Sequence, residues 1–286
     1  MTDKTVQVGE RLAVSYDITN RGQSDGEQTV ELRVGGEVVD SDALVLDVGS
    51  TDRMSLVTDA FTDEDDGQLY EVEIVTDDRV AQVMTVEVIA IPDEGLLLID
   101  FDDDDLSEFA GDTDDFATTT ELSQTGSRSL TTPDESQTPR IFSNTLLDDS
   151  SLEFKRGTVW EGYIAEDADS AGAMWIFGED INNWYGFQFR IDGGQIRIEK
   201  MEDGSRETLE TESFQSLNGN TFFKQIVTIP EKGEGDIEYE LKDGETSLQK
   251  VSTPDDEFEI NGMGYYALFD SDIPYWDDPR LVRLLD

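Results

Sequence analysis

The chain has 286 residues, and its 67 acidic side chains outnumber the 20 basic ones, which gives a formal net charge of −47 at pH 7. It contains neither cysteine nor histidine, so disulfides, thiolate metal sites and histidine-based catalytic triads are excluded. Direct binding to nucleic acid is not expected either, because the sequence has no basic patch to neutralise phosphates.

The acidic residues are spread over the whole chain, and apolar residues still make up 36% of it. A disordered acidic segment would lack the aromatic and β-branched residues that build a core, so we expect a folded chain. Repulsion between surface charges reaches over about 10 Å at 0.1 M salt but over only about 3 Å at 1 M. The composition therefore predicts a surface adapted to high salt.

The length predicts two domains. No apolar stretch approaches the roughly 20 residues of a membrane span, so membrane insertion is not expected. The first residues lack the apolar segment of a secretion signal. We therefore expect the chain to stay in the cytoplasm unless it is assembled into a particle or released.

Residues 1–91 are predicted to form short β-strands. Between Arg11 and Asn20, apolar side chains occupy every second position, which is typical of a half-buried strand. Turn signals such as Gly35-Gly36 separate further strands, which are predicted at 29–34, 37–39, 43–48, 53–57, 70–75 and 80–88. About seven short strands without helical periodicity predict a small immunoglobulin-like β-sandwich.

Four segments of this domain resemble a known module. Residues 8–10, 19–22, 30–36 and 69–72 are similar to the CARDB-type immunoglobulin-like domains of archaeal and bacterial surface proteins. The resemblance implies a spacer or docking domain without a chemistry of its own.

A short linker is predicted at residues 92–95, where Pro92 ends one strand pattern, and the second domain is predicted at 96–286. This domain again lacks convincing helices, and its many strands predict a large two-sheet jelly roll, so the whole chain is expected to be all-β. The predicted strands are 96–101, 129–131, 158–164, 172–177, 184–191, 195–200, 222–229, 236–242 and 262–269.

The second domain also resembles a known family. Segments 98–106, 111–116, 126–130, 177–187, 236–244 and 261–264 are similar to the concanavalin A-like, or laminin G-like, sandwich of lectins, glucanases and haloarchaeal surface proteins. The resemblance implies the fold alone, since this sandwich hosts hydrolases, lectins and inert modules.

Glucanases of this fold carry carboxylates in alternation on one strand, because retaining cleavage needs an acid and a nucleophile about 5 Å apart. Asp236, Glu238 and Glu240 imitate that pattern. In the resemblance, however, this strand precedes a turn and lacks the flanking Trp and apolar residues of a catalytic cleft. We interpret the three residues as a solvent-facing acidic stripe and predict that the protein is not an enzyme.

A hairpin around Gly193-Gly194 contains the candidate glycan site. With a two-residue turn there, Arg190 would lie opposite Arg197 and the apolar side chains would share the other face. An indole can stack on a sugar, an amide can bind hydroxyls, and arginines can bind uronate or sulfate groups. Alternatively, nearby carboxylates neutralise the arginines and no ligand is bound. The candidate glycan-binding residues are Trp184, Gln188, Arg190 and Arg197.

A structural calcium site is predicted where the first and last strands of the jelly roll meet. Asp100 and Asp102 begin the second domain and Asp277 lies near its end, so their carboxylates could converge on one ion. Oxygen-rich, flexible clusters suit Ca²⁺, and sandwiches of the resemblance often hold such an ion near their termini. Chance runs of Asp in so acidic a chain are the alternative explanation.

Together these observations favour a non-enzymatic virion structural protein of a halophilic archaeal virus, such as a capsid turret, decoration or tail-fibre subunit. Its first domain would dock onto capsid or tail proteins, its second would contact host-envelope glycans, and copies would form a symmetric assembly. The expected location is the virion surface. The alternatives are a haloarchaeal cell-surface adhesion protein and, less favoured, a glycoside hydrolase.

Overall fold

The computed structural model describes most of the chain and divides it into two compact units, Met1–Ile91 and Pro92–Asp286. Its strands confirm the all-β prediction. The predicted linker lies partly outside the described residues. The described residues are 4–285 without 77–78, 93–94, 103–104, 134–137, 148–153, 167–171, 192, 215–216, 218, 220 and 269–272.

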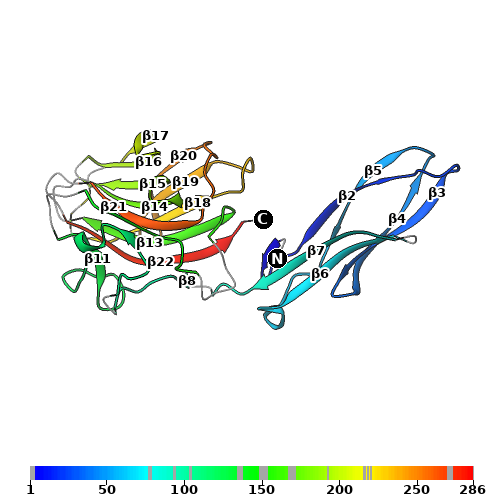
Figure 1. Ribbon diagram of the computed structural model, residues 1–286, viewed down its shortest axis with the longest axis horizontal. Coiled ribbons are helices and arrows are strands. Elements are labelled where there is room, and N and C mark those ends of the chain that lie inside the picture. The colour runs from blue at the N-terminus through cyan, green and yellow to red at the C-terminus, as the bar shows by residue number, and fades with distance from the viewer. Residues whose placement is uncertain are drawn as a thin grey trace. The chain divides into compact units, whose positions relative to one another are not determined.

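The first unit is a β-sandwich of a five-stranded sheet, in the order β1-β7-β6-β3-β4, and a two-stranded sheet, β2-β5 (Figure 1). The predicted strands 37–39 and 43–48 form one continuous strand, β4. Its hairpin with β3 turns at Gly35 and Gly36, whose φ angles of 58° and 87° favour glycine. The strands are β1 Lys4–Gln7, β2 Ala13–Thr19, β3 Gly26–Val34, β4 Glu37–Leu46, β5 Thr51–Val57, β6 Leu69–Thr76 and β7 Arg79–Ile89.

Alternation along these strands separates a core from a solvated face, as the period of two predicts. The inward side chains form one apolar cluster that includes Val30, Leu32, Val72 and Val86, each at most 1% exposed. This unit therefore has a hydrophobic core of its own. It also carries the large apolar side chains that are exposed within the described part of the chain, among them Val45 and Leu69.

The second unit is a larger sandwich of two sheets (Figure 1). One has the order β10-β11-β22-β13-β18-β19-β20 with β8 paired to β22, and the other has the order β17-β16-β15-β14-β21-β12-β9. The strands are β8 Leu96–Leu97, β9 Ala110–Gly111, β10 Ala117–Thr119, β11 Ser129–Thr131, β12 Arg140–Ser143, β13 Thr158–Glu166, β14 Ala173–Asp180, β15 Asn183–Arg190, β16 Gln195–Glu202, β17 Ser205–Ser213, β18 Phe223–Ile229, β19 Ile237–Asp243, β20 Thr246–Thr253, β21 Gly262–Ala267 and β22 Pro274–Leu284.

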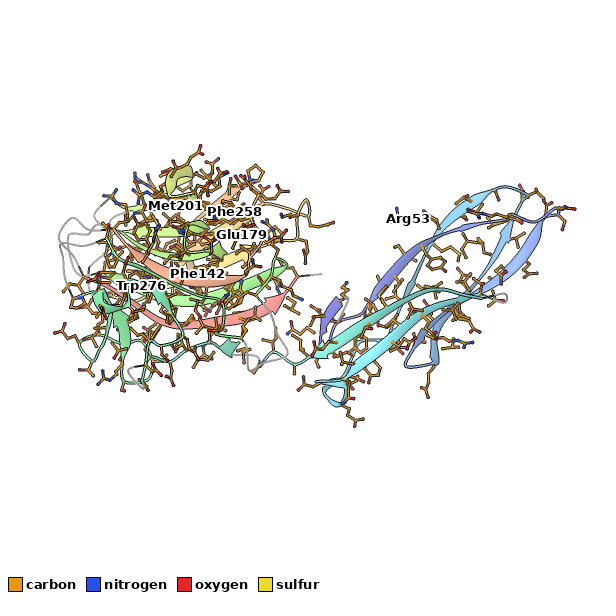
Figure 2. The ribbon with its side chains drawn as sticks, viewed as in Figure 1. Arg53, Phe142, Glu179, Met201, Phe258 and Trp276 are labelled. Atoms are coloured by element: carbon orange, nitrogen blue, oxygen red, sulfur yellow. The ribbon has the colours of Figure 1, made fainter. Side chains whose placement is uncertain are left out.

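Aromatic side chains fill the space between these sheets. Phe177 packs against Trp160, Trp175 and Phe187 with ring centroids 4.8–5.9 Å apart, and Phe187 packs in turn against Tyr239. Large buried rings contribute strongly to the stability of a core. Figure 2 labels Phe142, Met201 and Trp276 among the side chains of this unit.

A buried carboxylate fixes the strands that build the candidate site. Glu166, at the end of β13, is 1% exposed and accepts hydrogen bonds from the amides of Ala173 on β14 and Ile191 after β15, at 2.9 and 3.0 Å. Hydrogen bonds from buried amides to a charged group offset the free-energy cost of desolvating that group. Within the described residues, the helical segments are the two 3-10 turns Asp63–Asp65 and Thr113–Asp115, and no helix is long and apolar enough to cross a membrane.

Candidate functional site

The candidate site lies on one face of β15, β16 and β17, which we call the arginine face. Residues paired across neighbouring strands point to the same side of a sheet, so the strand register defines the members of this face. Apart from the apolar Trp184 and Met201, which lie on the same side, they are Gly186, Gln188 and Arg190 from β15, Gln195, Arg197 and Glu199 from β16, and Arg206, Thr208, Thr211 and Ser213 from β17.

The register of the predicted hairpin is wrong by two residues. Arg190 pairs with Gln195 and Arg197 pairs with Gln188, so the two arginines do not lie opposite each other. The reason is the loop, which is longer than two residues and is closed by a hydrogen bond from the Gly194 amide to the Ile191 carbonyl at 3.2 Å. A shift of two residues preserves the faces, so the predicted polar face is still assembled.

Trp184 is not the exposed stacking platform that the sequence predicts, because its side chain is fully buried. The residue two positions along the same strand is Gly186, and a Cβ there would lie 2.7 Å from Cζ3 of the indole, so the ring lies over the bare backbone. The indole Nε1 donates to the Ile181 carbonyl at 3.1 Å, and the ring packs edge-on against Tyr266. Trp184 thus belongs to an apolar cluster on the outer side of the sheet.

Gln188 is also covered, with an exposed fraction of 2%. A Cβ on Gly172 would lie 2.2 Å from the Gln188 Nε2, so the backbone of that glycine lies directly against the amide. Of the four predicted glycan-binding residues, Arg190 and Arg197 remain half-exposed and Trp184 and Gln188 do not. The accessible part of the polar face is therefore its arginine-rich end.

Three arginines surround a single carboxylate at that end. Arg206 Nε lies 3.2 Å from Glu199 Oε2, and Arg197 Nη1 lies 4.0 Å from Glu199 Oε1. Arg190 also acts electrostatically on this carboxylate. Burial raises the pKa of Glu199 above its usual value, and the positive charges of Arg206, Arg197 and Arg190 offset part of that rise.

A β-bulge keeps acidic side chains off this face. The register between β16 and β17 shifts between Ile198 and Glu199, which leaves Leu209 as the extra residue of β17 and inverts its alternation. As a result Arg206 and Thr208, before the bulge, share a face with Thr211 and Ser213 after it. The glutamates of β17 all pair with residues of the other face, and they are Glu207, Glu210 and Glu212.

Two of the three carboxylates considered as catalytic groups, Glu238 and Glu240, form surface ion pairs. Glu238 Oε1 lies 2.7 Å from Lys250 Nζ, and Glu240 Oε2 lies 3.9 Å from Lys242 Nζ. Glu238 and Glu240 sit on β19 with alternating burial, facing away from its buried side chains Ile237, Tyr239 and Leu241. This arrangement is that of a charge-balanced sheet surface rather than a cleft between two carboxylates.

Two of the residues predicted to bind calcium, Asp102 and Asp277, accept hydrogen bonds from backbone amides. Asp102 Oδ1 accepts the amides of Ser127 and Arg128 at 2.9 and 3.0 Å. Asp277 is 2% exposed, and its Oδ2 accepts the amide of Gln124 at 2.7 Å. Both carboxylates thus fix the loop before β11 through backbone amides. The described residues contain no group of three or more acidic side chains placed to share an ion.

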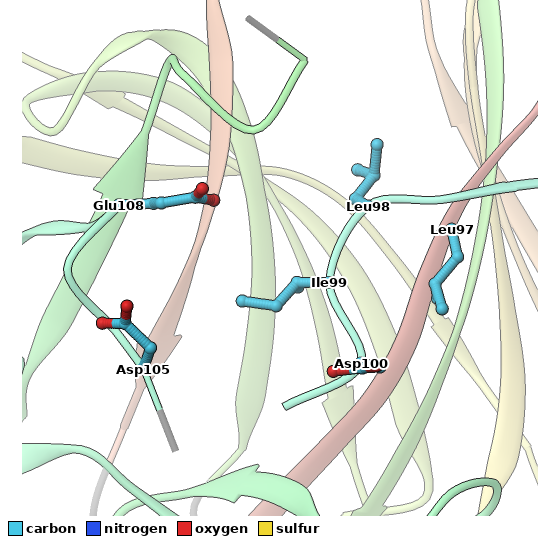
Figure 3. A pocket seen from close by; sticks show the side chains of 6 residues that line it. All are labelled: Leu97, Leu98, Ile99, Asp100, Asp105 and Glu108. Atoms are coloured by element: carbon cyan, nitrogen blue, oxygen red, sulfur yellow. The ribbon is translucent and has the colours of Figure 1, made fainter. Parts of the chain in front are cut away.

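The third predicted ligand, Asp100, instead lines a surface hollow of about 310 Å³. Figure 3 shows the acidic side chains of Asp105 and Glu108 on one wall, with Ile99 and Asp100 on the other. One oxygen of Asp100 accepts the Asp102 amide at 3.0 Å, and one of Asp105 accepts the Ser107 amide at 2.8 Å. These contacts are turn hydrogen bonds within the chain.

No family model matches the chain, and no curated protein matches its sequence. Among solved structures, the carbohydrate-binding module CBM66 from Bacillus subtilis is 12% identical over 58% of this chain and 95% of its own, with a TM-score of 0.42. A toad ovary galectin in complex with thio-digalactose is 17% identical over 44% of this chain and 94% of its own, with a TM-score of 0.33. The binding domain of botulinum neurotoxin serotype C1 is 10% identical over 63% of this chain and 44% of its own, with a TM-score of 0.39. No function is transferred from likenesses this distant.

Proposed function

We propose that the second unit is a non-catalytic module that binds glycans on the arginine face. The observation that carries the proposal is the composition of that face. The chain has 67 acidic residues among 286, yet the ten residues of the arginine face include one acidic side chain and three arginines. The remainder of the protein is strongly acidic, so the positive charge of this face distinguishes it as a surface for a ligand.

The chemistry of the face suits sugars. Guanidinium groups donate in a planar fork, and the Gln195, Thr208, Thr211 and Ser213 side chains both donate and accept hydrogen bonds. Sugar hydroxyls need both kinds of partner. The side chains stand on paired strands, which hold them more precisely than loops would.

The proposal is tested with the full chain in about 3 M KCl, where its surface charge is screened. We expect saturable binding to a panel of immobilised glycans and host-envelope fractions, and a loss of about tenfold in affinity for Arg197→Gln, which removes a charge-assisted contact. The matched control is Arg53→Gln, because Arg53 is an exposed arginine of β5 in the first unit (Figure 2). Absence of binding to every glycan, or equal loss in both variants, would contradict the proposal.

For the whole protein we propose display at a surface in a saline environment, either as a structural subunit of a virion or as an archaeal cell-surface protein. The net charge of −47 supports the saline setting, and an all-β unit with its own core supports a spacer role for residues 1–91. Mass spectrometry of purified virions and of cell envelopes separates the two locations. A protein found in neither fraction would contradict both.

A further inference from the structure

We propose that Arg197 and Arg206 form an anion subsite for a sulfate or carboxylate group of the bound glycan, and that Glu199 is the internal counter-ion that competes with that group. This inference rests on the proposed function, because it assigns a ligand class to the same face. Arg206 enters the site only through the structure, since β17 is not predicted from the sequence, whereas Glu199 lies on the predicted strand 195–200.

Glu199 does not satisfy the hydrogen-bond donors of the two arginines. Its contact with Arg206 at 3.2 Å is a charge contact without hydrogen-bond alignment, and its contact with Arg197 is longer, at 4.0 Å. The Nε of Arg197 is buried and has no hydrogen-bond partner among the described residues. An unused donor on a positive group favours a ligand that supplies a charged acceptor.

The two arginines are more accessible to solvent than Glu199 is. The side chains of Arg197 and Arg206 are 24% and 40% exposed, whereas that of Glu199 is 3% exposed beneath them. A ligand arriving from solvent therefore meets the guanidinium groups before it meets the carboxylate. Arginine forks match the geometry of carboxylate and sulfate oxygens, so the class of ligand follows from the exposed groups.

The local charge balance around Glu199 also favours an anionic ligand. The groups that face Glu199 are Arg190 from β15, Arg197 from its own strand, and Arg206 and Thr208 from β17. One carboxylate beside the guanidinium groups of Arg197 and Arg206 leaves an excess of positive charge, and protonation of Glu199 increases it. Because burial raises the pKa of Glu199, this side chain is protonated at a higher pH than an exposed glutamate would be. A sulfate ester stays ionised over that range, so its affinity is expected to rise as the pH falls.

The experiment compares dextran sulfate with unsulfated dextran on the full chain in about 2 M KCl, which screens long-range attraction and leaves contact pairs. We expect dextran sulfate to bind at least about tenfold more tightly. Arg206→Gln should remove this preference, and Arg53→Gln should keep it. Glu199→Gln should raise the affinity for dextran sulfate several-fold and abolish its rise at low pH.

Thermal unfolding of each variant verifies that β16 and β17 remain folded. If Glu199→Gln unfolds, the pH dependence of the unmodified protein decides, since a subsite with a competing Glu199 must bind dextran sulfate more tightly below the pKa of that group. Equal affinity for the two polymers with glycan binding otherwise intact would overturn the anion subsite alone. Failure of all glycans to bind would overturn the proposed function as well.

Discussion

At the scale of single residues, Asp277 is the buried charge with the clearest consequence. Desolvation raises its pKa to about 6, against the hydrogen bonds from the amides of Gln124 and Thr125, which lower it. A carboxyl group with a raised pKa in the folded state contributes stability that is fully present below its unfolded pKa. That contribution is lost as the pH rises through about 6.

We therefore expect the free energy of unfolding of the protein, relative to that of Asp277→Asn, to decrease by about 2 kcal/mol between pH 4 and pH 7. The asparagine keeps an amide oxygen for the loop amides but does not ionise. Denaturant unfolding at both pH values in constant KCl measures the difference. Asp52→Asn, at an exposed position of β5, is the control and should show a smaller change. A flat or opposite trend for Asp277 would contradict the assignment.

At the scale of elements, strands with clear alternation or apolar runs could be predicted, whereas seven others were not: β1, β9, β10, β12, β17, β20 and β22. The predicted segment 129–131 coincides with β11, and 158–164 lies within β13. In contrast β17 is missed because eight of its nine residues are exposed, so no hydrophobic period marks it. β22 is missed because Pro274, Pro279 and the adjacent aspartates suggest a loop. A bulge there, with Asp278 at φ 49°, leaves Pro279 out of the pairing and lets the strand continue.

The candidate site was only partly predictable for the same reason. The polar face of the hairpin follows from alternation alone, whereas Arg206 and the bulge at Leu209 depend on a strand with no hydrophobic signal. The alternation of the strand does contain a signal for the burial of Trp184. Gly186 lies two residues later on the same face, and a bulky ring can lie over a strand glycine.

Glycines on the sheet next to the site also set a limit on substitution. Gly264 lies in β21 between β14 and β12, and a Cβ there would lie 2.0 Å from the Ile141 carbonyl oxygen and 2.8 Å from the Phe142 Cα. Both are backbone atoms, which cannot move without disturbing the pairing of β12 with β21. We expect Gly264→Ala to reduce the free energy of unfolding by about 2–3 kcal/mol.

Differential scanning fluorimetry or denaturant unfolding in 3 M KCl measures this loss. The matched control is Gly193→Ala in the loop after β15, where the nearest side-chain atom to an added Cβ is 3.8 Å away. That variant should change the stability by less than about 0.5 kcal/mol. Comparable losses of stability at the two glycines would show that the close approach of Gly264 to β12 does not cause the destabilisation.

At the scale of the whole molecule, the charge of −47 links folding to salt. Repulsion among carboxylates destabilises the compact state and is screened over about 3 Å at 1 M salt. We expect the melting temperature to rise by at least about 10 °C between 0.5 and 3 M KCl, which corresponds to a few kcal/mol of relieved repulsion. Circular dichroism across a KCl series measures it.

The exposed glutamates of β17 offer a control for that series. Glu207, Glu210 and Glu212 share one face of the strand. Replacing all three by glutamine lowers the local charge density, so the variant should remain folded at lower KCl concentrations than the unmodified protein does. If the salt dependence were unchanged, hydrophobic contacts strengthened by salt rather than screening would account for it.

The tryptophans of the chain give this molecule a built-in division of its spectroscopic signals. The four of them, Trp160, Trp175, Trp184 and Trp276, all belong to the second unit, and each is at most 1% exposed. Fluorescence excited selectively in tryptophan therefore reports the unfolding of the second unit alone. The first unit contributes only tyrosine emission, from Tyr16 and Tyr70. A red shift of tryptophan emission as the salt concentration is lowered would show at which concentration the interior of the second unit becomes exposed to water, independently of any unfolding of residues 1–91.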